Sequence, residues 1–125
     1  MQYLLMIYGN EAATKAAAKA ETEQVVAAYR SYIEAMTKAG IVLGTNRLQF
    51  STTATTVRVA DGKTQVLDGP YAETKEQLAG YLLIDVPDLD TALSWAARCP
   101  GANNGVVEVR PIWQIQAATQ QYAAE

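Results

Sequence analysis

Histidine is absent from this chain of 125 residues, and cysteine occurs once, as Cys99. The absence of histidine excludes a Ser-His-Asp triad, a Cys-His pair and every metal site that uses imidazole. A single cysteine excludes an internal disulfide and argues against zinc and iron–sulfur sites. Acid–base chemistry must come from carboxylates, tyrosines, lysines or a bound cofactor. Because the chain also lacks a phosphate loop, a dinucleotide-binding glycine pattern and a metal-ligand motif, we expect no cofactor and no metal.

Positive charge is scarce as well. Lysine and arginine total 10 against 13 acidic residues, which gives a net charge of −3. No basic surface is therefore available for direct binding of nucleic acid or an anionic membrane. The apolar run at the N-terminus is too short, and its start too poor in basic residues, for a signal peptide, so we expect a cytoplasmic protein.

The hydrophobic pattern predicts one domain over residues 1–113, followed by a polar tail at residues 114–125 that either frays or lies across a partner subunit. Apolar, β-prone runs predict strands at residues 3–8, 41–48, 80–86 and 106–112. The Ala-rich segment at residues 11–20 has little to bury, and we expect an exposed loop or an extra helical turn there.

Two stretches have helical spacing. The first begins near Glu21 and ends at Gly40, and its apolar positions recur at steps of three and four: Val25, Val26, Tyr29, Tyr32, Ile33 and Met36. The second begins with Asp88 as N-cap and ends before Pro100-Gly101. We expect it to bury the following apolar residues: Leu89, Ala92, Leu93 and Ala96.

A β-hairpin is expected between the second and third of these strands. Val57 and Val59 alternate with polar residues, Asp61-Gly62 provides a tight turn, and the pattern returns through Val66. The order strand, helix, strand, hairpin, strand, helix, strand predicts an α+β, ferredoxin-like fold with an inserted hairpin and two helices on an antiparallel sheet. Strands 3–8 and 80–86 are apolar on both faces, so we expect a homodimer of the dimeric α/β-barrel type.

The stretch "DGPYAETKEQLAGYLLIDVPDLDTALSWAARCP", together with "YLLMIYG" and "VEVRPI", resembles the YCII-related, or DGPF-domain, family. The resemblance implies a ferredoxin-like dimer with a pocket between the first helix and the sheet. In YciI-like relatives a histidine and an aspartate form a catalytic dyad, and one branch removes halide from chlorinated muconolactones. The histidine position, eleven residues before Gly40, holds Tyr29 here, and the matching aspartate is Asp68.

A tyrosine with its ordinary pKa of about 10 is a poor base at neutral pH, so the dyad chemistry does not carry over. In the enzymatic interpretation, Asp68 is the general base and Tyr29 donates to an enolate oxygen in a lyase-, isomerase- or dehalogenase-like proton transfer. The alternative, which the resemblance also implies, is a non-catalytic regulatory module associated with an extracytoplasmic-function sigma factor. In a third interpretation Asp68 only builds the turn.

The polar run after this corner is a candidate ligand-binding wall. Alternate residues of an extended segment project to one side, and we assign ligand binding to Tyr71, Glu73, Thr74 and Lys75. A solvated strand edge explains the same residues equally well. Arg110 is a candidate for binding an acidic substrate, although an ion pair with Glu108 is the more economical role.

Overall fold

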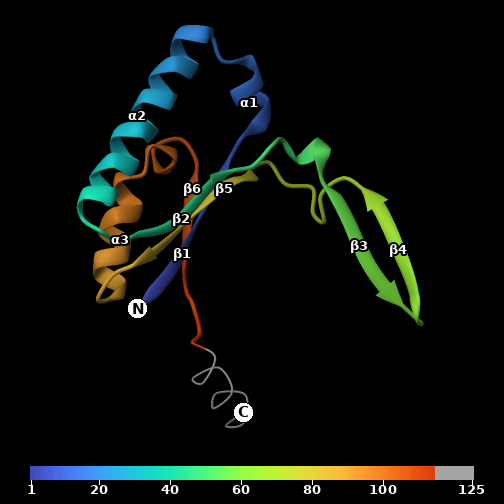
Figure 1. Ribbon diagram of the computed structural model, residues 1–125. Coiled ribbons are helices and arrows are strands. Elements are labelled where there is room, and N and C mark those ends of the chain that lie inside the picture. The colour runs from blue at the N-terminus through green and yellow to red at the C-terminus, as the bar shows by residue number, and fades with distance from the viewer. Residues whose placement is uncertain (115–125) are drawn as a thin grey trace.

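The computed structural model describes residues 1–114, which form a main body and a protruding arm (Figure 1). The body holds four strands: β1 (Gln2–Gly9), β2 (Val42–Arg47), β5 (Gln77–Asp85) and β6 (Val106–Pro111). Its helical elements are α1 (Glu11–Ala16), α2 (Lys19–Lys38), α3 (Leu89–Arg98) and two short 3₁₀ turns, η1 (Ser51–Thr53) and η2 (Pro100–Ala102). The arm is the hairpin of β3 (Thr55–Ala60) and β4 (Lys63–Asp68).

The four body strands form one antiparallel sheet in the order β2-β5-β1-β6. Helices α2 and α3 contribute to the hydrophobic core on one face of this sheet. The arrangement confirms the predicted α+β, ferredoxin-like fold. The predicted tail falls, from residue 115 onward, outside the described residues.

The core explains why β1 and β5 form the centre of the sheet. In β1, Tyr3, Leu5 and Ile7 are buried under the helices, while the residues between them point to the opposite, half-exposed face. Leu82 and Ile84 of β5 lie on the same buried side. Complete burial of a side chain of this size contributes about 1.5–3 kcal/mol, so these strands carry much of the stability of the body.

Helix α3 buries a narrower stripe than its sequence predicts. Ala92 and Ala96 are buried, whereas Leu89 and Leu93 are 46% and 47% exposed, so the prediction that both leucines are buried is wrong. Leu93 follows Ala92 by one residue, which places it about 100° further around the helix. The helix thus packs its small alanines against the body. Asp88 is the N-cap as predicted, because its Oδ1 accepts a hydrogen bond from the Thr91 amide at 2.8 Å.

The Ala-rich segment forms a helix of its own. Asn10 caps α1 by accepting a hydrogen bond from the Ala13 amide at 3.0 Å, and α2 begins at Lys19. Only the second half of α2 reaches the core, through Tyr32 and Met36. Within the part of the chain that the structure describes, no helix is long and apolar enough to cross a membrane.

The arm leaves the body between β2 and β5 and pairs only with itself in the described sheets. Its turn places Asp61 and Gly62 at φ values of 51° and 73°, as the tight turn predicted from Asp-Gly requires. The arm is closed at its base by a hydrogen bond from the Gly69 amide to the Ala54 carbonyl at 2.7 Å. Figure 1 shows β3 and β4 extending away from the helices and the four-stranded sheet.

Candidate functional site

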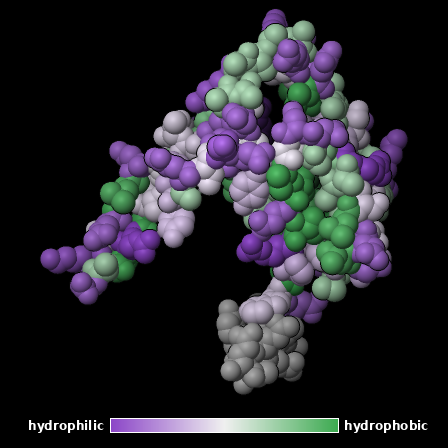
Figure 2. Space-filling view, turned by 180° about the vertical axis from the view of Figure 1, so that it is seen from behind, coloured by the Kyte–Doolittle hydropathy of each residue, from purple (hydrophilic) through white to green (hydrophobic). Residues whose placement is uncertain are grey.

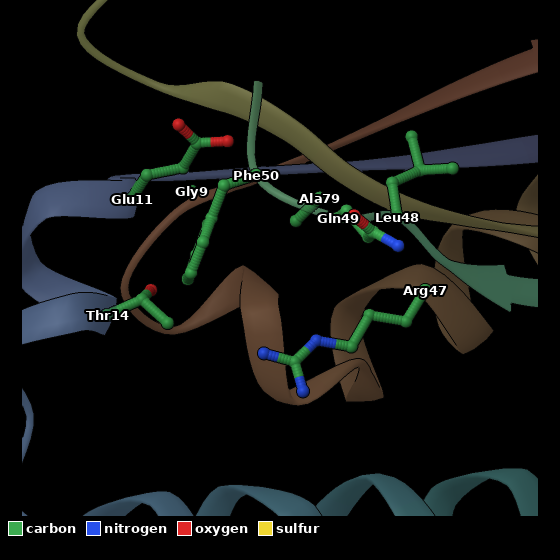
Figure 3. Close-up of a pocket in the computed structure, with 8 residues that line it drawn as sticks. All are labelled: Gly9, Glu11, Thr14, Arg47, Leu48, Gln49, Phe50 and Ala79. Atoms are coloured by element: carbon green, nitrogen blue, oxygen red, sulfur yellow. The ribbon is translucent and has the colours of Figure 1, made fainter. Parts of the chain in front are cut away.

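A small hollow lies where β1 and β2 end, beside α1 and η1. Its volume is about 50 Å³, enough for a few water molecules, whereas pockets for drug-sized ligands measure roughly 300–1,000 Å³. It therefore fits the head group of a small molecule. The lining residues are Gly9, Glu11, Thr14, Arg47, Leu48, Gln49, Phe50 and Ala79 (Figure 3).

One wall of the hollow is built by a clamp between α1 and η1. The carboxylate of Glu11 accepts hydrogen bonds from the Ser51 amide at 2.6 Å and from the Ser51 hydroxyl at 2.7 Å. One turn later, the Lys15 ammonium lies 4.7 Å from the centre of the Phe50 ring, an attractive cation–π arrangement. Both oxygens of Glu11 are thus engaged, and its charge serves to hold η1.

Arg47 supplies the positive charge of the hollow. In Figure 3 its guanidinium and the Glu11 carboxylate point away from each other. Among residues 1–114, the structure records no hydrogen bond or ion pair for the Arg47 side chain. Arginine presents a planar fork of donors that matches a carboxylate. Arg47 is therefore available to an anion that residues 1–114 do not provide.

Tyr29 lies on α2 and is close enough for the charge of Arg47 to act on it. Burial raises the pKa of Tyr29 well above its usual value, and the Cys99 thiol beside it adds to the rise, while a backbone hydrogen bond from Gly101 and the positive charge of Arg47 oppose it. The thiol of Cys99 donates to the Tyr29 oxygen at 3.8 Å. At neutral pH the phenol is thus protonated, and it acts as a hydrogen-bond donor and not as a base.

Asp68 lies elsewhere in the chain. It is an exposed residue at the end of β4, opposite Thr55 in the hairpin. Figure 1 places β4 and α2 on opposite sides of the molecule, so one chain does not bring Asp68 and Tyr29 together. The corner itself requires a glycine after Asp68, because Gly69 has a φ of 104°, which side chains rarely adopt.

The polar run after the corner makes local contacts. The Thr74 hydroxyl donates to the Glu76 carbonyl, and the Gln77 amide group donates to the Thr74 carbonyl at 2.6 Å. The side-chain oxygen of Gln77 also accepts from the Glu11 amide at 3.0 Å. The run is thereby tied to the start of α1. Three of the assigned ligand-binding residues of this run remain exposed beside it: Tyr71, Glu73 and Lys75.

Arg110 differs from Arg47 in having an anionic partner. Its Nη2 lies 2.5 Å from Glu108 Oε2, the ion pair that the sequence offers as the alternative to ligand binding. Neither Arg47 nor Glu11 was predicted from the sequence to be a site residue. The available signal was positional, since both charged residues stand at or just after the end of a strand, and strand ends commonly carry the binding groups of a fold.

Two comparisons relate this chain to known proteins. The YCII-related domain matches residues 1–116 of the chain. The uncharacterized protein R00369 of Rhizobium meliloti (strain 1021) is 45% identical over 118 residues, which cover 90% of this chain and 92% of that protein. The family match spans all the described strands and helices. The chain belongs to the YCII-related domain family.

Proposed function

We propose that this protein binds a small carboxylic acid, with Arg47 and Tyr29 as the donors that hold its carboxylate or the adjacent oxygen. The observation that carries the proposal is the guanidinium of Arg47, which extends into the hollow without an anionic partner among residues 1–114. Glu11 is held by Ser51, and no ion pair between Glu11 and Arg47 is present in the described residues. A cation left in this position attracts an anionic ligand.

The protonated phenol of Tyr29 complements the guanidinium. Its oxygen lies 3.8 Å from the Cys99 sulfur, and the protonated hydroxyl can rotate to donate to a bound anion. Tyr29 is not among the residues that line the hollow, but it is close enough to Arg47 to feel its charge, and a cation beside a neutral donor favours a carboxylate or an enolate. The hollow of about 50 Å³ takes only the acidic end, so the remainder of the ligand has to lie outside it.

Turnover requires a base in addition to these donors. Asp68 is the base implied by family resemblance, and it lies on the other side of the same chain from Tyr29. A lyase-, isomerase- or dehalogenase-like proton transfer would therefore need Asp68 from a second chain or a basic group on the substrate itself. Binding without turnover needs no such base. For this reason we propose a binding protein of the cytoplasm in preference to an enzyme.

Calorimetric titration with succinate, malate and benzoate tests the proposal. We expect at least one of these acids to bind and Arg47→Gln to weaken it about 10- to 100-fold, the range for a lost charged hydrogen bond. Arg110→Gln is the matched control, since that arginine already pairs with Glu108. The affinity of this variant for the acid should remain within about twofold of that of the unsubstituted protein. Equal losses in the two variants would contradict the assignment of Arg47.

A regulatory interaction module is the second candidate, and one observation favours it. Val25 and Val26, on the first half of α2, are 49% and 43% exposed, so this part of the helix offers some apolar surface to a partner. A module of this kind, working with a sigma factor, predicts that none of the three acids binds. It also predicts that a polypeptide, and no small molecule, accompanies the protein in native mass spectra.

A further inference from the structure

The short link between η2 and β6 contains the pair Asn104-Gly105. When glycine follows an asparagine, the next backbone nitrogen reaches the side-chain amide with little obstruction, because glycine has no Cβ. Asparagine counts among the thermolabile residues of proteins for the reaction that then follows. The pair is therefore a candidate site for a covalent modification that needs no enzyme.

Both reacting groups of the pair are free. The Asn104 side chain is exposed, and within residues 1–114 neither it nor the Gly105 amide makes a hydrogen bond. Two other asparagines are held in place: Asn10 accepts from an amide of α1 at 3.0 Å, and Asn46 donates to a tyrosine hydroxyl of β5 at 2.8 Å. An amide without an acceptor is easier to deprotonate and to turn toward a neighbouring carbonyl, so Asn104 is the asparagine best placed to react.

The backbone at Gly105 is tightly packed. A Cβ atom there would lie 2.2 Å from the Tyr8 carbonyl oxygen and 3.1 Å from the Gly101 carbonyl oxygen. Gly101 in turn lies against Tyr29, since a Cβ at Gly101 would be 2.5 Å from the phenol oxygen. Position 105 thus requires glycine, and any lengthening of the backbone beside it pushes on η2 and, through η2, on the tyrosine.

We propose that Asn104 deamidates spontaneously and that the product loosens the contact of η2 with α2 and β1. The Gly105 nitrogen attacks Cγ of Asn104 and forms a new C–N bond, which closes a succinimide ring. The bond from Cγ to the side-chain nitrogen breaks, and that nitrogen leaves as ammonia with the proton that the Gly105 amide loses. Water then adds to one of the two ring carbonyls and opens the ring. The reaction consumes only water and involves no oxidation.

The two ways of opening the ring have different structural effects. One gives aspartate, which adds a negative charge on an exposed side chain and leaves the backbone unchanged. The other gives isoaspartate, whose backbone is longer by a methylene group immediately before Gly105, where the packing leaves no room. The fraction of chains with a displaced η2 therefore grows with the age of the protein. The inference goes beyond ligand binding and does not depend on it.

Peptide mapping by mass spectrometry tests the reaction. The purified chain is incubated at neutral and at mildly alkaline pH, and we expect the acid at position 104 to accumulate faster at the higher pH, because the attacking nitrogen must lose its proton. Asn103 is the control in the same peptide, since it is also exposed but precedes an asparagine. It should convert at least about 10-fold more slowly, a difference of about 1.4 kcal/mol in activation free energy. Equal rates at the two positions, or no conversion at Asn104, would overturn the proposal.

Urea unfolding of fresh and aged protein tests the structural effect. The isoaspartate form, separated from the aged sample by ion exchange, should have a midpoint lower by about 0.5 M or more. Asn104→Ser cannot deamidate and should keep its midpoint on ageing. Asn104→Asp has the new charge without the longer backbone and should unfold like the fresh parent chain. A midpoint as low in Asn104→Asp as in the isoaspartate form would assign the effect to charge and contradict the packing argument.

The arm provides a second control, because Figure 2 shows it standing apart from the body. Its tip is the Asp61-Gly62 turn. Asp61→Asn, combined with Asn104→Ser, moves the Asn-Gly pair from the packed link to this tip. Isoaspartate formed there should leave the urea midpoint of the body unchanged. A fall equal to that of the aged parent chain would mean that the tight packing around Gly105 is not the cause, and the proposed effect on η2 would be wrong.

Discussion

The substitution Gly101→Ala is a direct test of where the Tyr29 side chain lies. A Cβ atom at Gly101 would lie 2.5 Å from the Tyr29 hydroxyl oxygen and 2.8 Å from Cγ2 of Ile7. Both distances are well inside van der Waals contact, so Gly101→Ala forces η2 away from α2 and β1 or displaces the tyrosine. Overpacking of this kind costs about 1–3 kcal/mol. The backbone at Gly101 does not need glycine, and the reduced freedom of the unfolded alanine chain offsets about 0.4–1 kcal/mol.

The net loss for Gly101→Ala should therefore be about 1–2 kcal/mol in the free energy of unfolding, or roughly 0.5–1 M in the urea midpoint at a slope near 2 kcal/mol/M. Because the hydroxyl oxygen is the nearest obstacle, the loss should shrink by at least about 0.5 kcal/mol in a Tyr29→Phe background. Gly44→Ala is the matched control, since a Cβ there meets nothing within 4 Å. The reasoning is refuted if Gly101→Ala unfolds like Gly44→Ala, or if the loss is the same with phenylalanine at position 29.

The other predictions concern pH. Burial raises the pKa of Tyr29 and of Tyr32 above the value of about 10 that tyrosine has in the unfolded chain. The contribution of the two protonated tyrosines to the free energy of unfolding is therefore fully present at neutral pH, and it is lost as the pH rises above about 10. Urea midpoints between pH 8 and 11 should fall, and should fall less in Tyr29→Phe. The pKa of Asp88 is lowered by hydrogen bonds from the Thr91 hydroxyl and amide, so its stabilisation is present above the unfolded pKa and is lost as the pH falls through the folded one. Asp88→Asn keeps a cap, and its melting temperature between pH 5 and 2 should decline less steeply than that of the parent chain.

The sequence contained most of the information needed for the body. The alternation in β1, the Asp88 cap and the Asp61-Gly62 turn each depend on neighbours in the chain, and each formed as the local pattern indicated. Leu89 and Leu93 did not, because helical spacing identifies a hydrophobic stripe but not how close the helix lies to the sheet. Alanines at 92 and 96 allow a closer approach than leucines, and the leucines remain at the edge.

The candidate site was harder to predict because it depends on contacts between distant segments. Arg47 becomes notable only once Glu11 is known to be engaged by Ser51, and no local pattern encodes that pairing. Asp68 shows the converse difficulty. Its motif is prominent in the sequence, yet β3–β4 pairing carries it to the side of the molecule away from Tyr29. Patterns of residue type identify which groups can act, whereas topology decides which of them meet.

The hydrogen bond between Gly69 and Ala54 has a consequence for how proteins of this kind can diversify. It brings the two ends of the arm within 2.7 Å of each other, donor to acceptor, so the hairpin leaves and re-enters the body at a single point. Residue pairs can be added to or removed from its tip without moving β2, β5 or the residues around Arg47. The arm is therefore a natural site for length variation, for grafting a recognition sequence, or for transplanting a different hairpin onto an unchanged body.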